Sequence, residues 1–353
     1  MTTEVRVALI GYGLAGASFH APTIAATRGL RLATIVTASP ERQERARREH
    51  PAAHVVDRVD AIFADPSGHD LVVVATPNST HVPLALAALA AGQAVVVDKP
   101  FAPTADEARR VVAEARRRGL FLSVYHQRRW DSDTLTLRRL LAEGALGDVL
   151  RFESRIERWR PMPRGGWRES DAPGGAGGLL YDLGSHLVDQ ALHLFGPVAR
   201  VYAELDRRRP GITVDDDVFL ALTHASGVRA HLWVSALAGQ PGPSVRALGT
   251  RAAYVKLHAD GQAAALLAGE RPDGPDWGVE LPAHWGLIGV GEEARPVRSE
   301  PGAYPRYYAG VVASLRQGAP PPVDPDDAVA GLEILAAAQR SAARHETVVL
   351  PSR

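Results

Sequence analysis

The chain has 353 residues, more than one hydrophobic core usually supports, so we expect two domains. Its 40 Lys and Arg residues balance 40 Asp and Glu residues, which gives no reason to expect nucleic acid or an anionic membrane as the main partner. The absence of cysteine excludes disulfides, thiolate nucleophiles and thiolate metal sites. No signal-peptide pattern and no apolar run of membrane length is present, so we expect a cytoplasmic enzyme.

Residues 1–126 alternate short apolar runs with helical patterns, which is typical of a parallel sheet built from βαβ units. Predicted strands cover residues 5–10, 32–36, 71–75, 94–97 and 121–125. Two helix starts are marked, by Ser39-Pro40 and by the capping-box spacing of Thr104 and Glu107. The sequence therefore predicts a dinucleotide-binding type of domain over residues 1–126.

Strand patterns recur at shorter intervals after about residue 126, over residues 149–157, 198–205, 218–223 and 228–235. Such spacing favours a mainly antiparallel sheet. The glycine- and proline-rich stretch 161–178 is too long for a plain connector, and we interpret it as a loop over a site. Near the carboxyl end, Asp324-Pro325 opens an alanine-rich helix that we predict to reach about residue 343.

A glycine fingerprint, Gly11-Tyr12-Gly13-Leu14-Ala15-Gly16, follows the first predicted strand and opens a helix. In that context the glycines let the backbone approach a pyrophosphate, whose charge meets the amides at the start of the helix. We therefore predict that Gly11, Tyr12, Gly13, Leu14 and Gly16 bind a dinucleotide.

The end of the second strand bears on which dinucleotide binds, because a carboxylate there would accept hydrogen bonds from the ribose of NAD. The sequence offers Thr37-Ala38-Ser39 instead, and Ser39 with Arg42 could accommodate a 2'-phosphate. We predict NADP, with NAD as the alternative. The loop Thr76-Pro77-Asn78 and His81 beyond it are predicted further cofactor contacts, although the loop could also be a simple Pro-Asn turn.

Asp98-Lys99-Pro100 follows an apolar strand and would put a lysine where a bound dinucleotide presents its reactive ring. Lys99 can hold the reacting oxygen of a substrate, and Pro100 can fix the backbone beside the cofactor. The alternative is that Lys99 is an exposed lysine of a loop. Because a strand end and a proline flank it, we favour the catalytic interpretation.

Asp182 and His186 are four residues apart, and on a helix they share a face that Asp189 and His193 continue. A carboxylate beside an imidazole can orient it and raise its basicity, which suits a proton acceptor for an alcohol. On spacing alone, a solvated Asp–His pair is equally compatible with this pattern. We expect no metal, because no further cluster of ligands with compact spacing accompanies these residues.

Together, these motifs resemble the Gfo/Idh/MocA oxidoreductases. Gly11 to Gly16 matches the fingerprint of that family, and Asp98-Lys99-Pro100 matches its Glu-Lys-Pro motif with Asp in place of Glu. Gly178 to His186 matches its G-x-x-x-D-x-G-x-H segment. The sequence is most similar to the NADP-dependent scyllo-inositol dehydrogenase branch, through Phe19-His20-Ala21-Pro22, Asp98-Lys99-Pro100-Phe101, Arg128-Arg129-Trp130-Asp131-Ser132-Asp133 and Gly166-Trp167-Arg168-Glu169.

The resemblance implies an α/β fold with two domains. An N-terminal Rossmann domain would cover residues 1–126, and a C-terminal α+β domain with a large, mainly antiparallel open-faced sheet would cover residues 127–353. The helix 324–343 would pack back toward the first domain, and the sheet would form homodimers or homotetramers. Lys99, Asp182 and His186 would meet at the nicotinamide, with His186 as general base and Asp182 contacting His186 or a substrate hydroxyl.

Aromatic and polar side chains near the proposed site suit a polyhydroxylated ring, because they offer stacking faces and hydrogen-bond partners for hydroxyls. The predicted substrate-binding residues are Tyr125, His126, Arg129, Trp130, Trp159, Arg160, Trp167, Arg168, Tyr181 and Asp182. We predict NADP-dependent hydride transfer between nicotinamide and a secondary alcohol or ketone of a cyclitol or sugar. The alternatives are a catalytically silent, dinucleotide-sensing regulatory protein, and redox-assisted elimination or hydrolysis with a tightly bound cofactor.

Overall fold

A computed structural model describes residues 4–170 and 176–351, which divide into two compact units. The first unit comprises Met1–Gln127, Gln262–Trp277 and Ala303–Val329, and the second comprises Arg128–Gly261, Gly278–Gly302 and Ala330–Arg353. The single boundary between residues 126 and 127 stays a prediction. Residues 171–175 of the predicted loop 161–178 lie outside the described residues.

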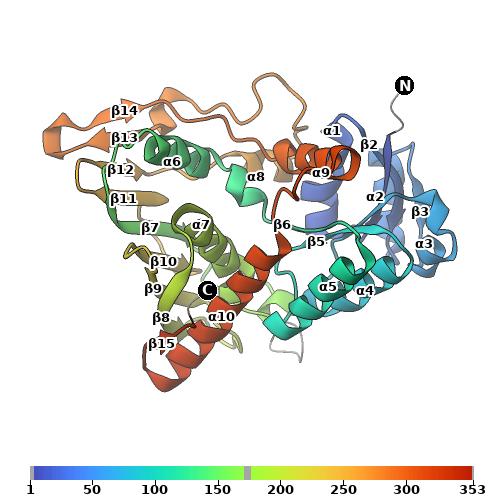
Figure 1. The fold of residues 1–353 in the computed structure, drawn as a ribbon, viewed down its shortest axis with the longest axis horizontal. Helices are drawn as coiled ribbons and strands as arrows, with labels where there is room; N and C mark the ends of the chain where they lie inside the picture. Colours follow the sequence, from blue (N-terminus) through green and yellow to red (C-terminus); the bar gives the residue numbers. More distant parts are fainter. Residues whose placement is uncertain (1–3, 171–175, 352–353) are drawn as a thin grey trace. The chain divides into compact units, whose positions relative to one another are not determined.

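The first unit is built on a six-stranded parallel sheet with the order β3-β2-β1-β4-β5-β6 (Figure 1). The strands are β1 (Val5–Ile10), β2 (Leu30–Val36), β3 (His54–Val56), β4 (Leu71–Val74), β5 (Ala94–Asp98) and β6 (Leu122–Tyr125). Every residue of β4 and β5 is buried, as expected for continuous apolar strands covered on both faces. The sequence pattern missed β3, which is three residues long and partly exposed.

Two helices of this unit, α2 and α5, begin at the residues that their capping signals predict. A π-helical turn (Gly16–His20) precedes α1 (Ala21–Ala26). The Ser39 hydroxyl accepts the N–H of Arg42, and the Thr104 hydroxyl accepts the N–H of Glu107, so both predicted caps are confirmed. The remaining helices are α2 (Pro40–Glu49), α3 (Asp60–Ala64), α4 (His81–Ala90), α5 (Ala105–Arg118), α8 (Gln262–Leu267) and α9 (Pro305–Gln317).

The second unit contains a nine-stranded sheet with the order β14-β13-β12-β11-β7-β10-β9-β8-β15. Its strands are β7 (Val149–Glu157), β8 (Val198–Asp206), β9 (Asp217–His224), β10 (Arg229–Ser235), β11 (Val245–Gly249), β12 (Ala253–Lys256), β13 (Gly286–Gly289), β14 (Arg295–Val297) and β15 (Val348–Val349). All neighbouring strands pair antiparallel except β7 and β10, which are parallel. The predicted α/β fold, with a mainly antiparallel second sheet, is therefore confirmed.

Three long helices contribute residues to this second unit. They are α6 (Ser132–Ala142), α7 (Ser185–Phe195) and α10 (Pro325–Arg344), which belongs to this unit from Ala330 on. Helix α7 packs against β7 and β10 of the sheet. Burial alternates residue by residue along β9, so alternate side chains face the core and the other face. The start and end predicted for the last helix agree with α10 to within one residue. Among the helices of residues 4–170 and 176–351, none is both long and apolar enough to cross a membrane.

Candidate functional site

The glycine fingerprint forms a tight turn between β1 and the π-helical turn. Gly11 has φ +102°, and a Cβ there would lie 2.4 Å from the carbonyl oxygen of Ala75. A Cβ at Gly16 would lie 2.0 Å from the carbonyl oxygen of Gly11. Only glycine therefore fits at these two positions, and the turn presents bare backbone at the carboxyl end of β1. Such a cradle fits the pyrophosphate of a dinucleotide.

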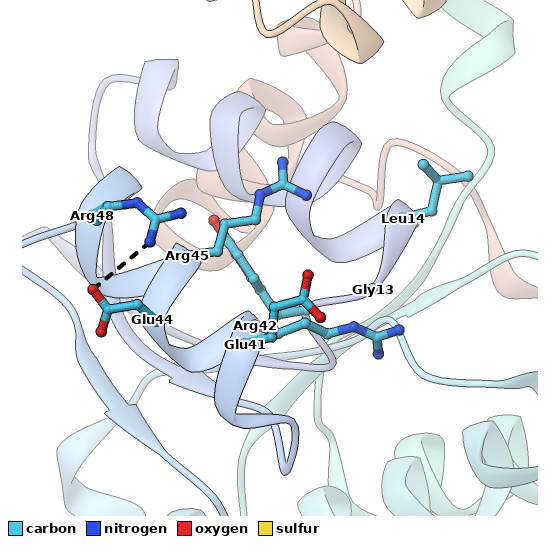
Figure 2. A pocket seen from close by; sticks show the side chains of 8 residues that line it. Gly13, Leu14, Glu41, Arg42, Glu44, Arg45 and Arg48 are labelled. Atoms are coloured by element: carbon cyan, nitrogen blue, oxygen red, sulfur yellow. Dashed lines mark ion pairs between the residues drawn. The ribbon is translucent and has the colours of Figure 1, made fainter.

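A pocket of about 460 Å³ opens between this turn and α2 (Figure 2). Its lining combines the turn with one polar face of the helix, and consists of Tyr12, Gly13, Leu14, Glu41, Arg42, Glu44, Arg45 and Arg48. Of the predicted cofactor residues, Tyr12, Gly13 and Leu14 of the fingerprint thus share this pocket with Arg42, whereas Gly11, Gly16 and Ser39 are not part of its lining. Arg45 and Arg48 were not predicted, although their spacing of three and six residues from Arg42 signals a shared helix face.

The three arginines of the pocket differ in their partners. Arg45 Nε lies 2.8 Å from Glu49, which also accepts the Tyr12 hydroxyl at 2.6 Å. Arg48 lies 3.7 Å from Glu44, as the dashed line in Figure 2 shows. Arg42 has no ion pair within the described parts of the chain, and its guanidinium lies 3.8 Å from the Cβ position of Gly13. Arg42 is therefore the pocket cation that is not neutralised by a protein carboxylate.

Asp98 braces the backbone of Lys99 at the carboxyl end of β5. One Asp98 carboxylate oxygen accepts the Lys99 N–H at 2.9 Å and lies 3.6 Å from His20 Nε2. His20 is fully buried, and its Nδ1 lies 2.6 Å from the Tyr308 hydroxyl. Burial raises the pKa of Asp98, but His20 and then Lys99 outweigh this effect, so the pKa is lowered and the carboxylate is charged. The Lys99-Pro100 peptide bond is cis.

His81 connects the loop after β4 to the turn Asp98-Lys99-Pro100, here called the lysine turn. His81 is buried, and its two ring nitrogens lie 2.9 Å from the carbonyl oxygens of Pro100 and Thr76. The Thr76 hydroxyl accepts the hydroxyl of Thr80, while Asn78 is buried and Pro77 is exposed. The predicted cofactor residues of this loop are thus at the carboxyl end of the sheet, where ligands of parallel sheets bind.

Two predicted substrate residues of the first unit lie in its core. Tyr125 is 1% exposed, and its ring packs 4.1 Å from the ring of His20 and 4.8 Å from that of Tyr307. Burial raises the pKa of the Tyr125 hydroxyl well above its ordinary value. His126 beside it is also buried. Their substrate contacts stay a prediction.

Asp182 and His186 lie at the start of α7 in the second unit. Residues Leu180–Gly184 form a π-helical turn instead of the expected α-helix, and Ser185 begins α7. Asp182 is partly exposed and lies 3.4 Å from Arg168 Nε, whereas His186 is buried. A π-helical turn bonds residues five apart, so the two side chains do not have the simple one-face relation of an α-helix. Such turns often occur at functional sites.

Arg129 is engaged by a carboxylate on α7. Its guanidinium donates to both oxygens of Asp189, with a shortest distance of 2.6 Å, and both side chains are buried. This ion pair ties the turn Gln127–Trp130, which precedes α6, to α7. Burial, followed by the charge of Arg129, lowers the pKa of His193 to about 4, so this imidazole is neutral at pH 7. The substrate contact predicted for Arg129 stays a prediction.

The tryptophans predicted to bind substrate differ in exposure. Trp159 is 61% exposed, while Trp130 and Trp167 are half-buried. The Arg168 guanidinium lies 4.3 Å from the Trp167 ring, so this cation reaches both a ring and Asp182. Trp167 and Arg168 belong to the described part of the predicted loop.

Asp215 is a site residue that the sequence did not suggest. Its carboxylate accepts the N–H of Leu180 at 2.6 Å and would clash with a Cβ at Gly178. Burial raises the pKa of Asp215 to about 6. The carboxylate fixes the start of the segment that carries Tyr181 and Asp182, and Tyr181 is buried beside it. No local pattern relates residue 215 to residue 180, because the contact joins distant parts of the chain.

Comparison with known proteins is consistent with these features. The model of an oxidoreductase family with an NAD-binding Rossmann fold matches residues 5–126, and the model of the GFO/IDH/MocA C-terminal domain matches residues 134–255. The oxidoreductase YdgJ of Escherichia coli strain K12 is 42% identical over 99% of this chain and 100% of its own length. The scyllo-inositol 2-dehydrogenase (NADP+) IolW of Bacillus subtilis strain 168 is 35% identical over 98% of this chain and 96% of its own.

The solved structures include close matches to the whole fold. The YPO2259 oxidoreductase from Yersinia pestis superimposes with a TM-score of 0.92 at 39% identity, covering 100% of this chain and 99% of that one. The fingerprint turn, the lysine turn and the Asp182–His186 segment thus lie on a fold and a sequence shared along nearly the full length. The chain therefore belongs to the GFO/IDH/MocA family of oxidoreductases, whose first domain is a nicotinamide-dinucleotide-binding Rossmann fold.

Proposed function

We propose that the protein is an NADP-dependent oxidoreductase that transfers a hydride between nicotinamide and a secondary alcohol or ketone of a cyclitol or sugar. The observation that carries this proposal is the presence of Lys99 at the carboxyl end of β5, on the same sheet as the glycine turn. The similarity to IolW, named for its action on scyllo-inositol with NADP+, supports the substrate class. The bound dinucleotide supplies the ring that gives or takes the hydride.

The proposed NADP preference rests on the pocket beside the glycine turn. A guanidinium matches a phosphate through two parallel hydrogen bonds, and Arg42 has no protein carboxylate as partner within the described chain. No carboxylate follows β2 directly, where NAD-binding domains accept hydrogen bonds from the ribose hydroxyl. Glu41 also lines the pocket, so the pocket is not purely cationic.

The chemistry at the substrate assigns one role to each of three residues. Lys99 holds the oxygen of the reacting carbinol through its ammonium group. His186 takes the hydroxyl proton during oxidation and returns it during reduction. Asp182 contacts a second substrate hydroxyl or orients His186. Around them, Trp130, Trp159, Trp167, Arg160, Arg168 and Tyr181 would contact the ring and its remaining hydroxyls.

A substrate panel tests the proposal. Purified protein is incubated with inositols, aldoses and their oxidised forms, and NADPH absorbance is followed in both directions. We expect turnover with at least one cyclitol or sugar, and faster turnover with the NADP couple than with the NAD couple. The proposal fails if binding of NADPH is demonstrated by fluorescence but no member of the panel changes the absorbance.

We also propose that the enzyme acts in the cytoplasm as a homodimer or homotetramer that associates through the second sheet. Light scattering coupled to size-exclusion chromatography measures the mass of the particle directly. A mass of two or four chains is expected, and the mass of a single chain at micromolar concentration would contradict the oligomeric proposal.

A further inference from the structure

His81 joins two loops that are both predicted to lie at the cofactor. Its ring lies at the start of α4, with Nδ1 2.9 Å from the Pro100 carbonyl oxygen and Nε2 2.9 Å from the Thr76 carbonyl oxygen. Thr76 begins the loop after β4, and Pro100 ends the lysine turn after β5. One side chain therefore sets the spacing between the two loops.

The chemistry of these partners limits the protonation state of the ring. A carbonyl oxygen only accepts hydrogen bonds, and a neutral imidazole carries one N–H donor and one nitrogen lone pair. In a neutral His81, one nitrogen lone pair would face a carbonyl oxygen at 2.9 Å, which is repulsive. Two donors are needed, and only the imidazolium has them. A ring flipped by 180° would lose both contacts, so the geometry also fixes the ring orientation.

A buried imidazolium needs a nearby anion, because an unpaired charge is costly to remove from water. Asp98 supplies it: this buried carboxylate attracts His81 and is itself charged. The Lys99 ammonium also acts on His81 and opposes its protonation. His20 Nε2 lies 3.6 Å from the same Asp98 carboxylate. Burial lowers the pKa of His81 overall, although Asp98 and the two carbonyl groups act in the opposite direction. The two carbonyl contacts, at 2.9 Å each, are the observation that favours the charged ring against this shift.

We propose that His81 is a positioning residue, held as a buried imidazolium that ties the loop after β4 to the Lys99-Pro100 turn. The two N–H groups donate to Thr76 and Pro100, and Asp98 balances the charge. Lys99 is thereby kept at a set distance from the loop after β4, which is predicted to contact the cofactor. The catalytic consequence rests on the proposed function, whereas the charge of the ring does not.

Nitrogen-15 NMR of the ligand-free protein, labelled in histidine, tests the charge directly. Both ring nitrogens of His81 are expected to show the protonated signature from pH 6 to pH 8, and assignment uses the His81→Gln variant. His224 is the internal control, because it is also buried but only its Nδ1 faces a carbonyl oxygen, at 2.8 Å. Burial lowers the pKa of His224, so a neutral ring is expected there. A neutral His81 at pH 7 would overturn the proposal.

The kinetic effect of His81→Gln tests the positioning role. We expect kcat to fall by about 10- to 100-fold, because small displacements of reacting groups are costly, while the KM for NADPH changes much less. His69→Gln is the matched control, since His69 is a partly buried histidine of the same unit that contacts the Thr34 hydroxyl. Both variants are assayed well below their melting temperatures. A kcat within twofold of the wild-type value would overturn the role.

Failure of the proposed function would give a different pattern of results. If no cyclitol or sugar is turned over by the wild-type protein, hydride transfer to that substrate class is refuted. The histidine spectrum is still obtained from the same protein, and it still decides whether His81 is charged.

Discussion

At the scale of single residues, Asp98, which stands where the family motif has Glu, contacts both the backbone of Lys99 and the side chain of His20. The shorter carboxylate accepts the N–H of Lys99 and lies near His20, which comes from the Phe19-His20-Ala21-Pro22 segment. His20 in turn contacts Tyr308. A buried series of polar contacts, from Asp98 through His20 to Tyr308, therefore supports the lysine turn, although these residues are far apart in the sequence.

The role assigned to Lys99 predicts that Lys99→Ala reduces kcat by about 10²- to 10⁴-fold, the range typical for loss of an acid–base or oxygen-holding group. NADPH binding, measured by fluorescence titration, should change by less than about threefold, since the glycine turn and Arg42 supply the phosphate contacts. Lys99→Arg retains the charge and serves as the conservative comparison. Full activity of Lys99→Ala would remove this residue from the mechanism.

Arg42→Ala should raise the KM for NADP by at least about tenfold and leave the KM for NAD nearly unchanged, because only NADP carries the 2'-phosphate. Arg47→Ala is the matched control: Arg47 is on the same helix and exposed, but does not line the pocket. The ratio of kcat/KM for the two cofactors is measured for each variant. An equal fall in kcat/KM with NADP and with NAD in Arg42→Ala would show that Arg42 does not recognise the 2'-phosphate.

Asp133 predicts a specific dependence of stability on pH. Burial, followed by the charge of Asp260, raises its pKa to about 6. The folded chain thus binds this proton more tightly than the unfolded chain, so its contribution to stability falls as pH rises from about 4 to about 6. Asp133→Asn removes this dependence. The free energy of unfolding of the variant relative to wild type, from urea titrations, should therefore increase between pH 4.5 and pH 8.

Asp57→Asn, a substitution at an exposed position, is the control for Asp133→Asn. The difference in the free energy of unfolding between Asp57→Asn and wild type should be the same at pH 4.5 and at pH 8. If the Asp133→Asn difference is equally independent of pH, then the carboxyl of Asp133 does not titrate with a raised pKa.

At the scale of elements, Glu169 links the described part of the loop to the connection between β8 and β9. Its carboxylate accepts the N–H groups of Arg164 and Gly165 at 2.7 Å each, and lies 2.9 Å from Arg209. Arg209 is buried and also pairs with the buried Asp216 at 2.9 Å. Glu169 is therefore one of the groups that hold the loop segment 164–169, which carries Trp167 and Arg168. The Gly178 N–H, which donates to the Arg168 carbonyl oxygen at 2.8 Å, and the Arg168–Asp182 ion pair are others.

Glu169→Ala should expose this segment to protease, because local opening is governed by few such contacts. Tryptic cleavage after Arg164 and Arg168 is expected to become several-fold faster, as followed by mass spectrometry under native conditions. Glu292→Ala, which changes an exposed glutamate of the second unit, should leave the rate unchanged. An unaltered cleavage pattern in Glu169→Ala would show that the loop is held by other contacts.

The sequence predicted elements best where a local pattern was strong. The limits of β1 and β7 were predicted to the residue, and the caps at Ser39 and Thr104 formed as expected. The π-helical turn at Leu180–Gly184 was not predicted, since the Asp215 carboxylate that accepts its first N–H, from Leu180, comes from a distant segment. The contacts of Arg129 and His81 were missed for the same reason: their partners are fixed by tertiary packing.

At the scale of the whole molecule, the family and the fold class followed from three separated motifs. The sequence did not predict that two later segments, Gln262–Trp277 and Ala303–Val329, belong to the first unit. Short segments of this kind leave no signal in composition or in hydrophobic periodicity. The catalytic proposal depends on both units, since Lys99 belongs to the first and His186 to the second.

The proposed role of His186 therefore predicts that changes in the second unit affect chemistry more than cofactor affinity. His186→Asn should lower kcat by about 10²- to 10⁴-fold at neutral pH, because the general base is lost. NADPH affinity should remain within about threefold of wild type. His231→Asn, a substitution of a half-buried histidine on β10, is the control. Weak NADPH binding with unchanged kcat would contradict the assigned role.

The single parallel pair, β7 with β10, gives the second sheet an unusual dependence on one strand. Strands β8 to β10 form one consecutive meander, and β11 to β14 form another. Strand β7 lies between them and supplies the backbone hydrogen bonds that join the two. Disrupting the backbone hydrogen bonds of β7 would separate the two meanders from each other. The same change in β14 would detach only an edge strand. The backbone hydrogen bonds that join the two meanders are therefore made by the nine residues of β7, Val149–Glu157.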